Sequence, residues 1–459
     1  MRIEKLYLKD VGPFGEQTIV FPEKKDPKKA EIHIFTGENG SGKSTILYAL
    51  AAGFGATAET LLLKRFRSSD SVCMCDTDLE TRSMFTQSSR DFPPNGNLPR
   101  NPKTCISRVE STPELDRHLA LHNQYVRLND SVEKMDVPLD GPSNFMLDAF
   151  LDQTLQFALF AYSGSRSLRS VSLLGIQEIK THPLKSSLSF YNTCDPVIFA
   201  QWLANTKAQA ALAAAEGDMK RSKSRHDSIR RIESAAGKIT NHKFQFVMDS
   251  KTMQISSKLD GQALELEVLP DGLKSIISWI GDLLMRMDRL KWESEVNVLD
   301  RNFILFLDEI EIHLHPAWQR KILPVIQELF PNAQIFVSTH SPFVVGSVKD
   351  AWVHAIELNN GEAKVLPPVE SMAGISIMAI SSEIFRAPEF DIETEKSIKR
   401  FYALKNDVLK GRNGSQKKQL SELKKLSLKL AKRGLEVRDI VAFEMNQMNR
   451  QLGKPNAAQ

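Results

Sequence analysis

The chain has 459 residues, of which 42% are hydrophobic and 25% charged, with a formal net charge of +4 and an isoelectric point near 8.7. This length allows one large core with a smaller module, or two to three ordinary domains. No run of about eighteen apolar residues occurs, and the opening MRIEKLYLKDVGPF alternates charged and apolar side chains. The pattern excludes a membrane span and predicts a cytoplasmic chain without a cleaved leader. The mild positive charge neither requires nor opposes nucleic-acid binding.

The four cysteines are few for this length and are predicted to remain thiols in a reducing compartment. Cys73 and Cys75 are separated by Met74 alone, whereas zinc knuckles place two or more residues between their cysteines. Two reduced thiols are therefore favoured over a metal site at this pair.

The first part of the chain reads as strands followed by a glycine-rich turn. Residues 2–22 form two alternating segments around Gly12–Gly15, which predicts a hairpin. A strand at Glu31–Thr36 runs into a glycine-rich turn and a helix at Lys43–Phe54. Residues 57–140 are rich in Ser, Asp, Asn and Pro, which predicts a loop-rich inserted lobe with short strands such as Cys105–Val109.

The second part alternates helical and strand patterns. Helices are predicted at Asn144–Phe157, within Gln201–Ala236, at Lys274–Met287 and at Pro316–Phe330, and strands at Glu265–Val268, Phe303–Leu307 and Gln334–Ser338. The pattern predicts an α/β head over residues 1–365, with a mixed or parallel central sheet flanked by helices and a helical arm at 200–262. Residues 366–459 are predicted to form a separate helical, Lys-rich module.

The turn at residues 37–45, GENGSGKST, fits G-x-x-x-x-G-K-[ST] between a predicted strand and a predicted helix. In this motif backbone N–H groups cradle phosphates, the lysine reaches the β- and γ-phosphates, and the hydroxyl after it ligates Mg²⁺. The alternative is a fortuitous glycine-rich turn. The sequence therefore predicts an ATP and Mg²⁺ site, with Lys43 also catalytic, formed by Gly37, Asn39, Gly40, Ser41, Gly42, Lys43, Ser44 and Thr45.

Two acidic residues follow the apolar strand FILFL. Asp308 would stand at the carboxyl edge of the sheet, beside the phosphate loop, where it can hold Mg²⁺ with Ser44. Glu309 points elsewhere and is the candidate general base that orients or deprotonates water. The alternative is a solvated acidic strand end.

The phrases GENGSGKST, DEIEIHLHPAWQ and FVSTHSPFVV resemble the ABC-type ATPases of the SMC/RecF class over roughly residues 1–365. More narrowly, they resemble the AAA-type ATPases of bacterial anti-phage operons, including the PtuA ATPases of Septu systems. The resemblance implies an ABC-type P-loop head in which His340 is a switch residue at the γ-phosphate. Without the resemblance, His340 would be read as an ordinary surface histidine.

The resemblance also implies a head-to-tail homodimer or higher homo-oligomer in which Leu269–Ser275 of one subunit caps the partner's ATP. Relatives usually have serine where this chain has Pro270, so a hydroxyl is missing, whereas Gly272 remains. Slow or regulated turnover is expected. The segment His313–Pro316 matches the stretch that runs across the dimer interface, and its alternative interpretation is a metal cluster of His313, His315 and Glu311.

Three further residues have roles with open alternatives. Arg166 is predicted either to contact nucleotide or a neighbouring subunit, or to form a structural salt bridge. Gln153 and Gln156 are the nearest candidates for the glutamine that senses Mg²⁺ in this class.

The tail Glu393–Arg450 is rich in lysine and has an apolar stripe of leucines at positions 420, 423, 426, 430 and 435. It predicts either a solvated helical face or a docking surface for a partner protein or DNA. No acidic cluster of the nuclease type follows His340.

These features favour a cytoplasmic ATPase subunit of an anti-phage complex, whose nucleotide state would control a companion HNH-type nuclease. The alternative is a RecF-like DNA repair ATPase that acts without an effector nuclease. No membrane partner is expected.

Overall fold

The computed structural model describes residues 1–54, 56–68, 71–78, 80–85, 103–108, 154–164, 171, 173, 175–249, 254–293, 296–385, 389–410 and 416–452. Residues 109–150, and with them most of the stretch predicted as an inserted lobe, lie outside this part of the chain.

The chain opens with the predicted hairpin, which is confirmed: β1 (Ile3–Val11) and β2 (Phe14–Val20) pair antiparallel. Three further strands extend it into a sheet of order β2-β1-β4-β5-β6, with β4 (Val72–Thr77), β5 (Glu80–Phe85) and β6 (Lys103–Arg108). Part of the region expected to be loop-rich is therefore regular structure, together with α2 (Ala56–Leu63).

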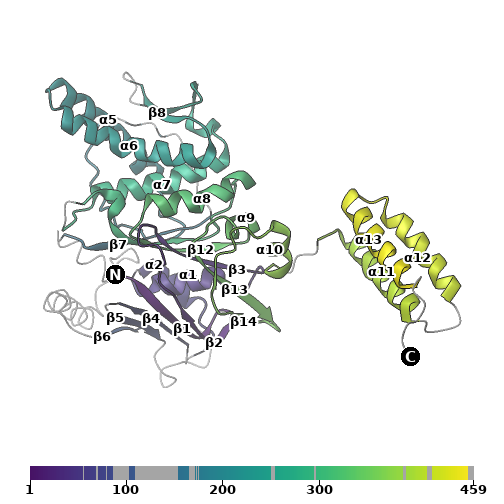
Figure 1. Cartoon of the computed structure of the whole chain (residues 1–459). Helices are drawn as coiled ribbons and strands as arrows, with labels where there is room; N and C mark the ends of the chain where they lie inside the picture. Colours follow the sequence, from purple (N-terminus) through teal and green to yellow (C-terminus); the bar gives the residue numbers. More distant parts are fainter. Residues whose placement is uncertain are drawn as a thin grey trace. The chain divides into compact units, whose positions relative to one another are not determined.

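A second sheet forms the centre of the head, with the order β14-β13-β3-β12-β11-β7 (Figure 1). Its strands are β3 (Glu31–Gly37), β7 (Phe157–Tyr162), β11 (Asn302–Leu307), β12 (Ala333–Thr339), β13 (Trp352–Asn359) and β14 (Glu362–Val365), and β15 (Val369–Glu370) pairs with β13. The five strands from β13 to β7 are parallel, so the predicted α/β fold with a largely parallel sheet is confirmed. Every residue of β3 and β12 is buried, as expected for parallel strands covered on both faces.

Helix α1 (Lys43–Ala52) lies between the two sheets and contacts strands of both. Nine of its ten residues are buried, which explains why it is apolar around its whole circumference. This placement fixes the start of the helix, and with it the glycine-rich turn, against the carboxyl edge of the central sheet.

The helices α7 (Asp271–Arg289) and α8 (Pro316–Leu329) lie on the other side of the central sheet, and α5 (Pro196–Ala215) and α6 (Met219–Thr240) pack beyond them (Figure 1). The helices predicted within Gln201–Ala236 are thus confirmed. A small antiparallel sheet follows, made of β8 (Phe244–Met248), β9 (Ile255–Leu259) and β10 (Gln262–Leu264). Among the helices that the structure describes, none combines the length and hydrophobicity that a membrane crossing requires.

Three predicted elements need correction. The strand expected at Glu265–Val268 is instead the 3₁₀ helix η1 (Leu266–Val268), because β10 completes the hairpin with β9 and the chain then turns into α7. Helix α7 begins at Asp271, three residues before the predicted start. Of the helix expected at Asn144–Phe157, only residues 154–157 are described, and these are not helical, since Phe157 opens the buried strand β7.

The first unit, Met1–Ile380, also contains the short helix α9 (Pro342–Val345). Helix α10 (Ile377–Glu383) runs from the end of this unit into the second unit, Ser381–Gln459. The second unit contains α11 (Ile392–Lys410), α12 (Gln416–Leu430) and α13 (Leu435–Leu452) around its own apolar core. The predicted helical tail is confirmed. Leu423 and Leu430 of the expected stripe are buried, whereas Leu435 is 71% exposed because it begins the third helix.

We expect Leu423→Ala to lower the unfolding free energy of this second unit by about 2–5 kcal/mol, because the change leaves a cavity in a small core. Leu428→Ala, on the same helix at a position 67% exposed, should change it by less than about 0.5 kcal/mol. Calorimetry of the full chain would resolve the two variants. Equal effects would show that α12 is packed differently.

Candidate functional site

The glycine-rich turn joins the end of β3 to the start of α1. Gly42 is the N-cap residue of α1 and has φ of 97°, a left-handed conformation that favours glycine. A Cβ atom at this position would lie 2.6 Å from the ring of Phe14, so no other residue fits without displacing the β1–β2 turn. Gly37 is constrained as well, since its Cβ would lie 2.4 Å from the carbonyl oxygen of Ile356.

The turn presents unpaired backbone donors. Among the described residues, no acceptor pairs with the N–H groups of Asn39, Gly40 or Gly42, and the first turn of a helix leaves its own N–H groups free. Ser41, by contrast, donates its N–H to the Glu38 carbonyl at 3.2 Å. Free N–H groups at the positive end of a helix form an anion-binding cradle.

Lys43 lies at the same turn. Its ammonium group donates to the carbonyls of Gly37 and Glu38 at 3.0 and 2.9 Å, and to the Ser41 hydroxyl at 3.5 Å. Burial lowers the pKa of Lys43 to about 8, although the nearby carboxylates of Glu311, Asp308 and Glu309 oppose this shift. The Lys43 ammonium group is therefore mostly protonated at neutral pH and loses its proton as the pH rises through about 8.

The hydroxyl of Ser44 donates to the Asp308 carboxylate at 3.0 Å, which joins residues 264 positions apart. Ser338, at the end of β12, also donates its hydroxyl to Asp308, whose own N–H donates to the Tyr162 carbonyl at 2.8 Å. Asp308 is 5% exposed. The parallel register of β3, β12, β11 and β7 brings all these strand ends to one edge of the sheet.

Glu309 follows in a left-handed conformation with φ of 50°, which costs a non-glycine residue about 1–3 kcal/mol. Its N–H donates to the Ser338 hydroxyl at 2.9 Å, which holds the turn in place. The residue lines a cavity of about 290 Å³ that also includes Ser44 and Asp308; the remaining lining residues are Tyr48, Arg65, Ser163, Gly164, Tyr191, Ile312 and His313.

His340 follows β12 and donates its backbone N–H to the carboxylate of Glu311. Burial, and secondarily the charge of Lys43, lowers the pKa of the His340 imidazole to about 4. The ring is consequently neutral at physiological pH and can offer an N–H donor without carrying a positive charge.

The structure places two residues in this region, Arg65 and Glu311, that the sequence does not predict as part of the nucleotide site. Arg65 donates to the Thr45 hydroxyl at 3.0 Å and its guanidinium lies 4.8 Å from the centre of the Tyr48 ring. Glu311 is a buried carboxyl group whose pKa is raised by burial, and its Oε2 atom has no hydrogen-bond partner among the described residues. No local pattern marks Arg65, and the sequence indicates Glu311 only as a ligand in the alternative metal cluster.

The predicted capping segment lies at the start of α7. Pro270 occupies the N-cap position, and Gly272 packs so tightly that a Cβ would lie 2.6 Å from the carbonyl oxygen of His313. Neither Pro270 nor Gly272 lines the cavity that holds Ser44 and Asp308. Gly272 instead packs against His313, which does line this cavity.

The remaining sequence candidates fall outside the site. Arg166 and Gln153 lie outside the described residues. Gln156 precedes β7, whereas Ser163 and Gly164 follow it, so this glutamine is at the wrong end of the strand and is not a ligand candidate. No group of three or more His, Cys, Asp or Glu side chains within the described part converges as a metal site, and this includes the segment around His313 and His315.

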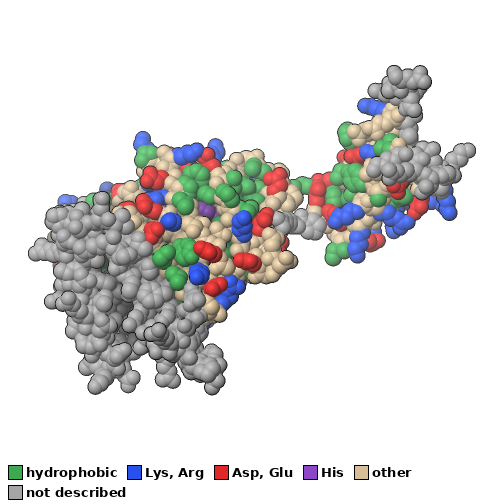
Figure 2. All heavy atoms as spheres, turned by 90° about the horizontal axis from the view of Figure 1, so that it is seen from below, with side chains coloured by type: hydrophobic (Ala, Val, Ile, Leu, Met, Phe, Trp, Pro, Cys, Tyr) green, Lys and Arg blue, Asp and Glu red, His purple; other side chains and the backbone are tan. Residues whose placement is uncertain are grey.

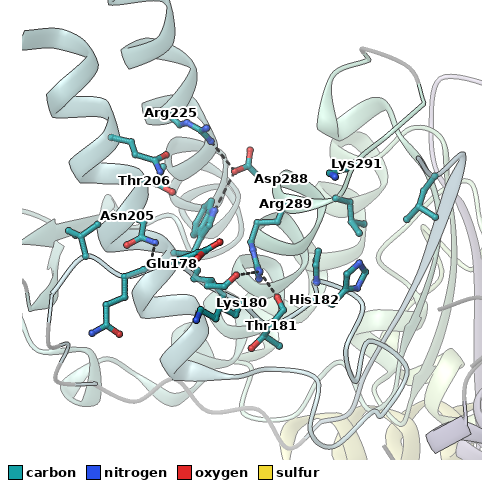
Figure 3. A pocket seen from close by; sticks show the side chains of 18 residues that line it. Glu178, Lys180, Thr181, His182, Asn205, Thr206, Arg225, Asp288, Arg289 and Lys291 are labelled. Atoms are coloured by element: carbon teal, nitrogen blue, oxygen red, sulfur yellow. Dashed lines mark hydrogen bonds and ion pairs between the residues drawn. The ribbon is translucent and has the colours of Figure 1, made fainter. Parts of the chain in front are cut away.

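A larger cavity of about 890 Å³ lies away from these residues, between the segment 176–183, α5, α6 and the end of α7 (Figure 3). Some of its polar groups bind one another. Asp288 accepts from Trp202 at 3.3 Å and pairs with Arg225 at 3.7 Å, while Arg289 donates to the backbone carbonyls of Ile179 and Thr181. These interactions join the arm to the head.

Comparisons with known proteins agree on the class of domain. A family profile described as "AAA domain, putative AbiEii toxin, Type IV TA system" matches residues 114–346, about half of the chain, and one described as "AAA domain" matches residues 5–90. The chain is 24% identical over 430 residues to the Retron Vc95 probable ATPase of Vibrio cholerae serotype O1 biovar El Tor, covering 82% of this chain and 77% of the relative.

Two shorter matches are to Septu proteins. The Septu protein PtuA of Bacillus thuringiensis is 35% identical over 97 residues, which cover 21% of this chain and 24% of the relative. The Septu protein PtuA of Bacillus mycoides (strain KBAB4) is 27% identical over 182 residues, which cover 39% and 25%. Among solved structures, the SMC head domain from Thermotoga maritima aligns with 81% of this chain and 100% of that chain, at a TM-score of 0.40 and 16% identity.

The lowered pKa of Lys43 predicts how phosphate binding depends on pH. Because only the protonated lysine attracts a phosphate, ATP affinity should be constant below pH 8 and fall by up to about tenfold per pH unit above it. Isothermal titration of ATP between pH 7.5 and 9.5 measures this. Lys43→Ala should bind more weakly throughout and lose the pH dependence, and an unchanged pH profile in this variant would contradict the assignment.

Proposed function

The chain belongs to the AAA-domain family whose description also names the AbiEii toxin of type IV toxin–antitoxin systems, and on this premise we propose that it is a Mg²⁺-dependent ATPase of an anti-phage defence complex. The observation that carries the proposal is the 3.0 Å contact between the Ser44 hydroxyl and the Asp308 carboxylate beside a turn of free N–H groups. The family membership gives ATP as the nucleotide, and the residue roles below are part of the proposal.

The donor set at this edge fits magnesium. A hydroxyl and a carboxylate are the hard oxygen ligands that Mg²⁺ prefers, and both are positioned by strand ends of the same sheet. Ser44 and Asp308 would hold the ion, while Asn39, Gly40, Gly42 and Lys43 would bind the phosphates. When bound, Mg²⁺ neutralises charge on the β- and γ-phosphates.

Glu309 is the proposed general base. The left-handed turn after β11 separates its side chain from that of Asp308, and the residue lines the cavity beside the metal pair. In hydrolysis it would accept a proton from the water that attacks the γ-phosphorus, and ADP with inorganic phosphate would form. Neutral His340 would donate a hydrogen bond to the γ-phosphate without adding charge.

A second subunit is proposed to complete the site. Pro270 and Gly272 stand at the amino end of α7, which is 19 residues long and directs its positive dipole outward at that end. Pro270 is exposed at this end whereas Gly272 is buried against His313, so Pro270 and the exposed start of the helix would face a partner's ATP in a head-to-tail homodimer. The absence of a hydroxyl at Pro270 predicts slow turnover.

The defence role is supported by the relatives, whose names include Septu proteins and retron ATPases. The sequence after His340 contains no nuclease-type acidic cluster, so a companion HNH-type nuclease would do the cutting under control of the nucleotide state. The alternative is a repair ATPase that acts on DNA alone.

Glu309→Gln should retain ATP binding and lose hydrolysis by about 10²–10⁴-fold, since it keeps the side-chain volume but removes the base. Phosphate release and nucleotide titration measure the two effects separately. Glu328→Gln, an exposed residue on α8, is the matched control and should leave both unchanged. Wild-type turnover in the Glu309 variant would place the general base elsewhere.

Two measurements separate defence from repair. The defence proposal predicts that a nuclease encoded beside this chain co-purifies with it, and that ATP alters its cutting. The repair alternative predicts that DNA stimulates ATP hydrolysis by the isolated chain. DNA-stimulated turnover without a bound nuclease would overturn the defence proposal.

A further inference from the structure

The two units differ in charge. Residues 381–459 contain 17 Lys and Arg against 10 Asp and Glu, a net charge of +7, whereas residues 1–380 contain 43 against 46, a net charge of −3. The positive charge of the whole chain therefore resides in the C-terminal unit. Such a segregation is typical of a surface that attracts a polyanion.

Within the C-terminal unit the charge is concentrated on two of the three helices. Helix α12 has five lysines and one glutamate, and α11 has five basic and three acidic residues, so their net charges are +4 and +2. Helix α13 has two arginines against three acidic residues, a net charge of −1. In the space-filling view, Lys and Arg side chains gather along one side of this unit (Figure 2).

Two ion pairs between α11 and α12 show which faces of these helices lie side by side. Arg400 pairs with Glu422, and Lys429 lies 4.0 Å from Glu393. Within each helix these partners are seven residues apart, so they lie on one face and the two rows run antiparallel. Lys396 stands between the two pairs on α11 and Lys425 between them on α12, and Lys418 continues the α12 row.

The three lysines between and beyond these pairs carry uncompensated charge. Lys396, Lys418 and Lys425 are exposed, and among the described residues no acidic side chain lies within 4.0 Å of their ammonium groups. The acids on this face, Glu393 and Glu422, already bind cations. The face defined by Lys396, Arg400, Lys418, Lys425 and Lys429 is called the lysine face below.

We propose that the lysine face binds the phosphate backbone of nucleic acid without reading its bases. A protein interface would need an apolar centre with charges at its rim. The large apolar side chains described in this unit that are more than 60% exposed are Ile392 (72%) on α11, Leu428 (67%) on α12, and Leu435 (71%) and Phe443 (68%) on α13, so each positively charged helix has only one. Lysine is a point charge on a flexible stem, which suits phosphates at variable positions and gives no base specificity.

The dimensions of the lysine face suit a short stretch of duplex. The fifteen residues of α12 span about 22 Å at 1.5 Å per residue, which corresponds to roughly six base pairs. Lys418 and Lys425 are two helical turns apart, about 10 Å along the axis, so each can contact a different phosphate.

The test measures binding of a fluorescein-labelled 25-base-pair duplex to the full chain by anisotropy at several salt concentrations. The lysine-face variant Lys418→Gln/Lys425→Gln should bind about tenfold more weakly at 0.1 M salt, and the slope of log K against log salt should fall by about 1.8. The control Arg438→Gln/Arg450→Gln removes the same charge from α13 and should change affinity less than about twofold. Circular dichroism and ATP titration should be unchanged in both variants.

Three results would overturn the proposal: no binding of the duplex by the wild-type chain, equal loss in the two double variants, or loss of a co-purifying nuclease instead of DNA binding. The last result would identify the lysine face as a protein-docking surface. Lys43→Ala should lose ATP and retain DNA, so failure of the ATPase assignment and failure of this proposal give different results.

Discussion

The contact between Ser44 and Asp308 is the interaction on which the site depends. Ser44 lies in the first turn of α1, which follows β3, and Asp308 directly follows β11. The register of β3, β12 and β11 brings the two side chains together. A shift of one residue in either pairing would move each strand's side chains to the opposite face and separate the hydroxyl from the carboxylate. Ser338, which binds both Asp308 and the N–H of Glu309, fixes the same edge from the strand between them.

The register is secured at the opposite end of the strands by a buried polar network. Gln334 of β12 exchanges two hydrogen bonds of 2.8 Å with the backbone of Ile3, and this links the central sheet to the first sheet. The Gln334 amide also donates to Glu31 at 2.7 Å. Burial raises the pKa of Glu31, but hydrogen bonds from His33 and Arg2 outweigh it and hold the pKa at about 2, so the carboxylate remains charged. With α1 enclosed between the two sheets, the phosphate turn has little freedom to change shape.

The parts of this arrangement that are visible in the sequence are those written as local patterns. GENGSGKST after a short apolar strand predicted the turn, and FILFLDE predicted the acidic edge, because strand periodicity and glycine spacing are local properties. Arg65 could not be predicted as a neighbour of Thr45 and Tyr48, since only the packing of α2 beside α1 brings it there. Gln156 could not be excluded from the sequence, because its pattern does not reveal which end of β7 faces the site. Similarly, Glu265–Val268 has too few residues for its pattern to distinguish a strand from a 3₁₀ turn.

The central claim is that Ser44 and Asp308 act on one magnesium ion, and a double-mutant cycle tests it most directly. Mg²⁺-dependent ATP affinity would be measured for the wild type, Ser44→Ala, Asp308→Asn and the double variant. If the two side chains share one ion, their effects are not additive, and the coupling energy should be about 0.5–3 kcal/mol. Strictly additive losses, with a coupling energy of zero, would contradict a shared magnesium site and the account built on it.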